Sequence, residues 1–128
     1  MNDRQWKIYL VDPFDSHLID RTGQRRVATT DSYENCVYLS SYLKGDFLIR
    51  VLLHELGHCV LFSYHLLEEI HNMTYPDHWI DMEEWICNFI ADYGFQIFKQ
   101  AYSFLGYDAW RKIPEEMDRL FLSKRSVS

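Results

Sequence analysis

Two histidines and a glutamate that could hold and use a metal ion stand in one pentapeptide, His54-Glu55-Leu56-Gly57-His58. On an α-helix, residues i and i+4 lie on one face, one above the other, so both imidazoles would point to the same place. Such a pair supplies two of the ligands of a tetrahedral zinc site. Glu55 lies beside that place and is positioned to take a proton from a metal-bound water rather than to bind the metal. The pentapeptide by itself therefore indicates a metal site, and hydrolysis depends on what the rest of the sequence supplies.

A hydrolytic zinc site needs a third protein ligand and keeps its fourth position open for water. The metzincin class would have glycine at position 61 and histidine at position 64, but the sequence has Leu61 and Tyr64, which excludes that class. His65 follows the pentapeptide by two helical turns, roughly 10 Å along the axis, and is out of reach. The spacing of His71 and His78 from the pentapeptide does not exclude either of them as the third ligand.

Two adjacent carboxylates, Glu83 and Glu84, are the strongest candidates for the third ligand. A glutamate from a neighbouring helix would complete a His₂Glu centre of the gluzincin kind. On a helical wheel of about 100° per residue, Glu83 shares a side with Cys87 and Ile90, whereas Glu84 lies at the border of the polar face. Burial alone favours Glu83, so the pattern of residues by itself leaves the choice open.

The segment that begins at Glu84 resembles a known signature. Residues 84–91 read Glu-Trp-Ile-Cys-Asn-Phe-Ile-Ala, and they are similar to the E-x-x-A-N-x-F-A signature of the ImmA/IrrE-type metallopeptidases. They follow H-E-L-G-H at the separation that this family shows. Cys87 stands where alanine is usual, and Ile90 stands where phenylalanine is usual. The similarity covers roughly residues 25–95 and implies a gluzincin-like zinc metallopeptidase with a zincin-like fold.

The resemblance also implies roles for single residues. Zn²⁺ would be bound by His54, His58 and Glu84, and Glu83 is the alternative third ligand. Glu55 would be the catalytic base. The reaction would be hydrolysis of a peptide bond in a protein substrate, such as a phage or mobile-element repressor. Many relatives carry further domains, for which this chain has no room, so we expect a minimal catalytic domain.

The sequence leaves three alternatives open. Tyr75 and His78, between the two helices that carry the ligands, are candidates to stabilise the oxyanion of the reaction, although a role in the loop itself fits both. The strand at 36–40 could pair with an extended substrate or lie inside the sheet. The alternative to an enzyme is a non-catalytic binding module of the same fold that regulates a partner by contact. The intact Glu55 favours the enzyme.

Local patterns predict the elements that must position these residues. Strand formers predict strands over 5–12, 25–30 and 36–40, with a further short strand over 17–22. The pentapeptide lies on a long helix from about 47 to about 70, with Asp46 as its N-cap.

A loop over 71–80 leads to a second helix that starts near 81 and is apolar on most sides, which predicts that it is buried. Gly94 within it suggests close packing, and Pro114 marks a last helix over about 114–123. We therefore expect an α+β fold in which a small antiparallel sheet packs on the long helix. It would form a single domain over 1–128, with residues 1–45 mainly strands and residues 46–128 mainly helices.

Composition limits the partners. With 128 residues, 48% of them hydrophobic, and a net charge of −6, the chain can build a core and is a poor general binder of nucleic acid. Its cysteines number 3 and include no C-x-x-C pair, which favours a reducing compartment. We expect a cytoplasmic protein, in the host cytoplasm if it is phage-encoded, with no leader and no membrane span, and with a protein or peptide substrate as its partner.

Overall fold

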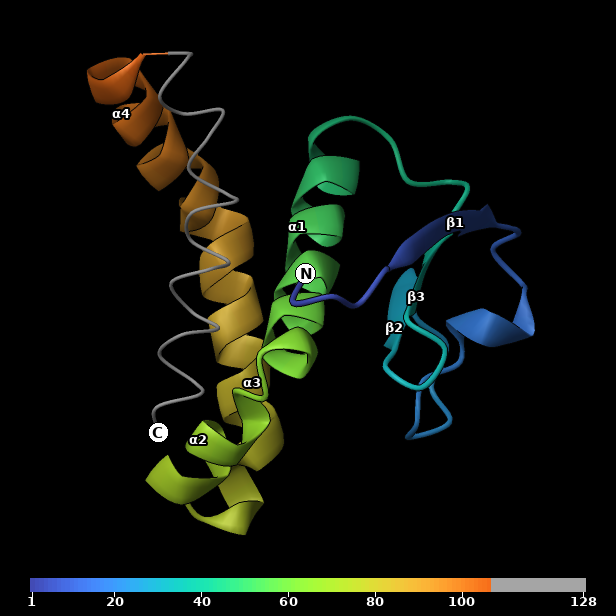
Figure 1. Ribbon diagram of the computed structural model, residues 1–128. Helices are drawn as coiled ribbons and strands as arrows, with labels where there is room; N and C mark the ends of the chain where they lie inside the picture. Colours follow the sequence, from blue (N-terminus) through green and yellow to red (C-terminus); the bar gives the residue numbers. More distant parts are fainter. Residues whose placement is uncertain (107–128) are drawn as a thin grey trace.

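The computed structural model describes residues 1–106 and has a mixed α+β architecture. Helix α1 lies between a small sheet on one side and a long helical rod on the other (Figure 1). The strands are β1 (Lys7–Val11), β2 (Ala28–Asp31) and β3 (Cys36–Ser40). The helices are α1 (Gly45–Ser63), α2 (Leu67–Met73), α3 (Trp79–Phe89), the π-helix η3 (Ile90–Gly94) and α4 (Phe95–Leu105), with short 3₁₀ turns η1 (Ser16–Leu18) and η2 (Pro76–His78). The α+β class is thus confirmed.

The sheet is mixed rather than antiparallel. Its strand order is β1-β3-β2, with β1 parallel to β3 and β2 antiparallel to β3. Only β2 and β3 are joined by a tight connection, whereas the chain between β1 and β3 is long enough for a crossover, which a parallel pair requires. The expectation of an antiparallel sheet is therefore wrong for β1. Strand β3 is the central strand, so both of its edges are already paired.

The segment predicted as a strand over 17–22 instead contains the 3₁₀ turn η1. The carboxylate of Asp15 accepts a hydrogen bond from the backbone N–H of His17 at 2.8 Å and caps this turn. A single antiparallel bridge, between Ile19 and Arg25, is all that remains of strand pairing there. Local side-chain bonding to the backbone thus replaces the ladder that the sequence pattern suggested.

The core lies between the sheet and α1. Val37 and Leu39 of β3 are buried against Val51 and Cys59 of α1. Cys59 is a core residue with an exposed fraction of 0%. A second apolar cluster joins the end of α1 to α2 and α3 through Leu61, Ile70 and Cys87. The helix of the pentapeptide is therefore held on both sides, by the sheet and by α3.

Helix α1 ends earlier than predicted, at Ser63 rather than near residue 70. His65 has a positive φ of 57°, and the N–H of Leu66 bonds to the carbonyl of Leu61 at 2.9 Å. These are the features of a Schellman motif, which closes a helix and turns the chain. Leu66 packs against the cluster that contains Leu61, which supplies the accompanying apolar contact. At the other end the helix begins at Gly45 with Lys44 as the N-cap, so the prediction of Asp46 as N-cap is wrong.

Helix α3 is less buried than its apolar sequence predicts. Its buried residues are Glu83 and Cys87, whereas Trp85 is 62% exposed and Phe89 is 42% exposed. It continues through η3 into α4 as one rod, and the ion pair of Arg50 with Asp92 at 2.7 Å ties this rod to α1. The helix predicted over 114–123 lies outside the described residues.

Within residues 1–106, no single helix is both long and apolar enough to cross a membrane. Helices α1 and α2 together have the length and composition, but they are bent by 87° at their junction.

The two helices that carry the histidines and the glutamates, α1 and α3, pack closely at Gly57. A Cβ atom added there would lie 3.2 Å from Sγ and 3.3 Å from Cα of Cys87. At Gly94 an added Cβ would meet only ordinary contacts, the nearest at 3.6 Å to Ile90. Close packing therefore explains Gly57, and the expectation that Gly94 makes such a contact is wrong.

We expect Gly57→Ala to lower the free energy of unfolding by about 1–2 kcal/mol, because the backbone of α3 must move away from the new methyl group. Gly94→Ala is the matched control. It should leave stability unchanged or raise it by up to about 1 kcal/mol, because alanine favours helix over glycine. Urea denaturation followed by circular dichroism measures both. Equal stability of the two variants would contradict the close contact.

Candidate metal centre

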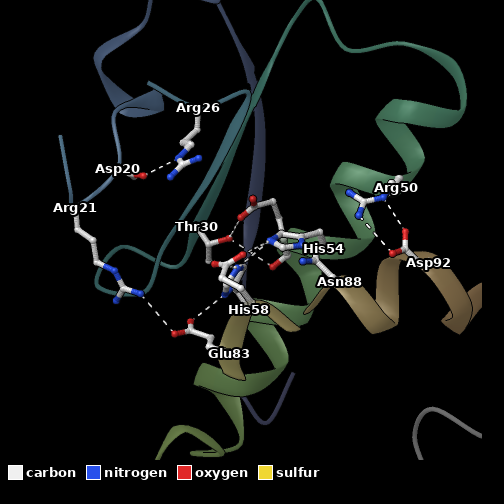
Figure 2. A network of polar contacts seen from close by, with 12 residues as sticks. Asp20, Arg21, Arg26, Thr30, Arg50, His54, His58, Glu83, Asn88 and Asp92 are labelled. Atoms are coloured by element: carbon white, nitrogen blue, oxygen red, sulfur yellow. Dashed lines mark hydrogen bonds and ion pairs between the residues drawn. The ribbon is translucent and has the colours of Figure 1, made fainter. Parts of the chain in front are cut away.

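The histidines of the pentapeptide are presented by α1 toward α3. Both lie on the face that meets α3, and the contact of Gly57 with Cys87 brings the two helices close at this level. Glu83, Glu84 and Asn88 lie on the facing side of α3. Figure 2 shows the imidazoles of His54 and His58 between Asn88 and Glu83. The i, i+4 spacing predicted from the sequence therefore directs both imidazoles toward a second helix, α3.

Three side chains converge at one point. The Nε2 atoms of His54 and His58 are 3.2 Å apart. The carboxylate of Glu84 places one oxygen 3.1 Å from His54 Nε2 and the other 3.3 Å from His58 Nε2. In a tetrahedral site with bonds of about 2.0–2.1 Å, neighbouring ligand atoms lie roughly 3.3 Å apart. The two Nε2 atoms are close to this separation, whereas the two distances of Glu84 belong to different oxygens. One ligand atom from each of His54, His58 and Glu84 lies within 4.8 Å of the other two, so the three side chains are close enough to bind one metal ion. The place where they converge is called the metal point.

Glu83 has a different contact. Its Oε1 lies 2.9 Å from Nδ1 of His58, the nitrogen that faces away from Glu84. Its Oε2 lies 3.5 Å from the guanidinium of Arg21. The side chain of Glu83 is only 7% exposed, against 43% for Glu84. Burial alone pointed to Glu83, but its carboxylate lies behind the imidazole rather than at the point where the three side chains meet.

The Nδ1 atom of His54 also has a hydrogen-bond partner. Nδ1 of His54 lies 2.9 Å from Oδ1 of Asn88, which stands one helical turn after Glu84. In Figure 2 the partners of the two Nδ1 atoms, Asn88 and Glu83, lie on either side of the imidazoles and both come from α3. Each histidine thus offers Nε2 to the shared point and Nδ1 to a residue of α3.

The charges of the cluster are strongly coupled. Burial acts to lower the pKa of His58, but its hydrogen bonds with Cys87, Glu83 and Glu84 outweigh burial and raise this pKa to about 12. Hydrogen bonds from His54 and His58 hold the pKa of Glu84 well below its usual range. Burial acts to raise the pKa of Glu83, but the bond from His58 and the nearby Arg21 hold it low. Glu83 and Glu84 are therefore ionised, and their charges favour the protonated imidazole of His58.

Glu55 is buried, with an exposed fraction of 7%. Its Oε2 accepts a hydrogen bond from the hydroxyl of Thr30 in β2. The same hydroxyl lies 3.4 Å from the backbone carbonyl of Glu55. The sheet therefore holds the glutamate that follows His54, and this carboxylate is not among the three groups that meet at the metal point.

The other candidates are not brought to this point. Tyr75 is 79% exposed, and His78 lies 3.9 Å from Asp81. His71 stacks on Trp79, with ring centroids 3.9 Å apart. Within residues 1–106, no hydrogen bond or ion pair joins these side chains to the cluster, and the same holds for His65. The structure thus gives no support to Tyr75 or His78 as an oxyanion donor.

The sequence did not predict that Thr30 and Arg21 contact residues of the site, nor that Asn88 contacts His54. Thr30 and Arg21 come from the region before β3, where nothing in their spacing relates them to the pentapeptide. Asn88 belongs to the signature at 84–91, and its position four residues after Glu84 could have indicated that it lies beside the metal site. An i, i+4 relation on one helix predicts that a residue shares the face of the metal ligand.

Comparison with known proteins yields no match to a family model, to a curated protein or to a solved structure.

Proposed function

We propose that this chain is a zinc-dependent endopeptidase domain with a zincin-like fold, of the kind that the ImmA/IrrE-type metallopeptidases represent. One observation carries the proposal. Nε2 of His54 and Nε2 of His58 lie 3.2 Å apart on the helix that also carries Glu55, and the two carboxylate oxygens of Glu84, from α3, lie 3.1 and 3.3 Å from them. Three protein ligands with a neighbouring, non-ligating carboxylate are the composition of a hydrolytic centre.

The chemistry of the ligands favours zinc. Two imidazole nitrogens and one carboxylate oxygen suit Zn²⁺, whereas Mg²⁺ and Ca²⁺ prefer oxygen ligands alone. A purely structural zinc site is closed by four protein ligands. In the described part of the chain the cluster offers three residues, which supports an open position for water and substrate.

The bound ion would acidify a water molecule and polarise the carbonyl of the scissile bond. Glu55 would accept the proton of the attacking water and pass it to the leaving amine. The hydroxyl of Thr30 fixes the orientation of the Glu55 carboxylate. The buried position of Glu55 keeps competing water away from this proton transfer.

The position of β2 supports an extended peptide as the substrate. β2 is at the end of the strand order β1-β3-β2 and carries Thr30, which contacts Glu55. Strand β3 is interior, so it is not the strand to which a substrate would add. A peptide that adds to the edge of β2 would run past the catalytic carboxylate. By the resemblance of residues 84–91, the protein that is cut would be a repressor of a phage or mobile element.

We expect the purified protein to hold about one zinc ion per chain, and removal of zinc by a chelator to lower its thermal midpoint. A ligand that binds only the folded state stabilises it by about 4 kcal/mol when present at 1,000 times its Kd. Elemental analysis and differential scanning calorimetry, with and without chelator, measure the two effects. A metal-free protein whose midpoint does not respond to added zinc would contradict the metal centre.

The peptidase activity itself is tested by incubation of zinc-loaded protein with a repressor encoded beside it and with unfolded casein. Mass spectrometry should detect new termini that form only when zinc is present. Fully metal-loaded protein that cuts neither substrate would overturn the endopeptidase function.

A binding module is the second candidate, because α3 and η3 expose a row of aromatic side chains. Trp85 stacks on Phe89, which contacts Tyr93, and these rings are 62%, 42% and 56% exposed. Such a row is suited to contact with another protein. If Glu55→Gln retains the full effect on a repressor, control by contact replaces cleavage.

A further inference from the structure

Both ligand imidazoles are contacted at the nitrogen that does not face the metal point. Nδ1 of His54 lies 2.9 Å from Oδ1 of Asn88, and Nδ1 of His58 lies 2.9 Å from Oε1 of Glu83. A carboxylate and an amide oxygen can only accept hydrogen bonds. Both imidazoles therefore donate from Nδ1, so a ring that gives up its Nε2 proton to bind a metal ion keeps its remaining proton on Nδ1.

We propose that Glu83 and Asn88 are positioning residues of the metal centre, which fix the tautomer and the ring orientation of His58 and His54. In the neutral form of each ring, a proton held on Nδ1 leaves Nε2 with a lone pair directed to one point, as a shared metal ion requires. A hydrogen bond from the second nitrogen of a ligand histidine also makes its coordinating nitrogen more basic. This inference rests on the proposed metal centre and assigns Glu83 a role other than that of third ligand.

The surroundings of Glu83 are built for this role. Its carboxylate is buried, and a buried charge needs partners. It has one on each oxygen, since Oε1 meets His58 and Oε2 lies 3.5 Å from Arg21. The guanidinium of Arg21 reaches it from the connection between β1 and β2 (Figure 2). The carboxylate thus has a defined direction even before a metal binds.

The connection that carries Arg21 is itself ordered by Asp20. The carboxylate of Asp20 accepts hydrogen bonds from the backbone N–H groups of Thr22 and Gln24, at 2.9 and 3.0 Å. It also pairs with Arg26 at 2.7 Å. Arg21 therefore projects from a folded turn, and Arg21, Glu83 and His58 form a chain of contacts from this turn to the metal ligand.

Asn88 reaches His54 from the same helix face as Glu84. The two residues are four positions apart on α3 and share one face of the helix. This face therefore supplies both the proposed ligand Glu84 and the hydrogen-bond partner of the His54 ring, Asn88. Glu83 precedes Glu84 and points to the far side of His58. Helix α3 thereby sets the orientation of the whole centre through Glu83, Glu84 and Asn88.

The test compares variants that remove the hydrogen-bond acceptor with variants that keep it. Glu83→Leu and Asn88→Leu remove the acceptor, whereas Glu83→Gln and Asn88→Asp keep an oxygen at the same place. Glu68→Leu, an exposed glutamate of α2, is the matched control. Zinc affinity is measured by competition with a chromophoric chelator, on full-length protein whose apo fold is checked by circular dichroism.

We expect the two leucine variants to lose zinc affinity by about 10–100-fold, and the Gln, Asp and control variants to stay within a few-fold of the wild type. Long-range ¹H–¹⁵N spectra of the zinc-loaded wild type should show one slowly exchanging Nδ1–H for each of the two histidines. Glu83→Leu should lose the His58 signal alone, and Asn88→Leu the His54 signal alone. A general loss of stability would not select one imidazole.

Wild-type affinity in both leucine variants overturns the inference, and so does Glu83→Gln if it loses as much zinc as Glu83→Leu. Neither result depends on cleavage. Zinc binding that shows this pattern in a protein that cuts no substrate would instead support the positioning residues and remove the peptidase function.

Discussion

Replacement of Glu55 by glutamine is expected to lower the rate of peptide hydrolysis by about 10²–10⁴-fold, the usual contribution of a positioned general base. Glutamine has nearly the same shape and can still accept the hydrogen bond of the Thr30 hydroxyl. It cannot take up a proton at neutral pH. The variant should therefore keep the fold and lose the reaction.

Zinc content should not change in this variant, because Glu55 is not among the three groups that converge on the metal point. Cleavage rate and zinc stoichiometry are measured on the same sample, with Glu68→Gln as a control for the chemical change alone. A variant that cleaves at the wild-type rate removes Glu55 from the mechanism, and one that loses zinc makes Glu55 a ligand.

Replacement of Glu84 by glutamine is expected to weaken zinc binding by more than about 100-fold, beyond the range of an outer hydrogen-bonding partner. The carboxylate of Glu84 faces both Nε2 atoms, at 3.1 and 3.3 Å. The amide removes the negative charge that Glu84 presents to the metal point and is a poor zinc ligand. Cleavage should be lost together with the metal.

The adjacent Glu83→Gln is the matched control, because it makes the same chemical change one residue earlier on the same helix. Its amide oxygen can still accept from Nδ1 of His58, so zinc affinity should stay within a few-fold of the wild type. Chelator competition separates the two variants. Loss of zinc in Glu83→Gln with retention in Glu84→Gln would exchange their roles.

The local features of the site could be predicted from sequence because they depend on residues close together in the chain. The i, i+4 spacing of His54 and His58 required only a helix, and α1 supplies it. Gly57 within the pentapeptide leaves one side of this helix without a side chain, and Cys87 of α3 packs there. The strand at 36–40 coincides with β3, because its β-branched and aromatic residues favour a strand wherever it is placed.

Two fold-level errors arise because local patterns show neither the direction in which strands pair nor the residue at which backbone bonds end a helix. The residues of β1 predict a strand but not its direction relative to β3, which depends on the path of the chain between them. The apolar run past residue 63 continues the helical pattern, yet the backbone bonds at His65 and Leu66 end the helix there. Such hydrogen bonds outweigh helix propensity where packing needs a turn.

By itself, the sequence determined that this protein has a helix with two histidines on one face, a glutamate beside them and two carboxylates downstream. Only the tertiary structure decided that Glu84 meets Nε2 of both histidines while Glu83 meets Nδ1 of His58. Adjacent residues on a helix differ by about 100° in direction. The rotation of α3 against α1, set by the contact at Gly57, therefore selects which glutamate reaches the metal point and which one stands behind the ring.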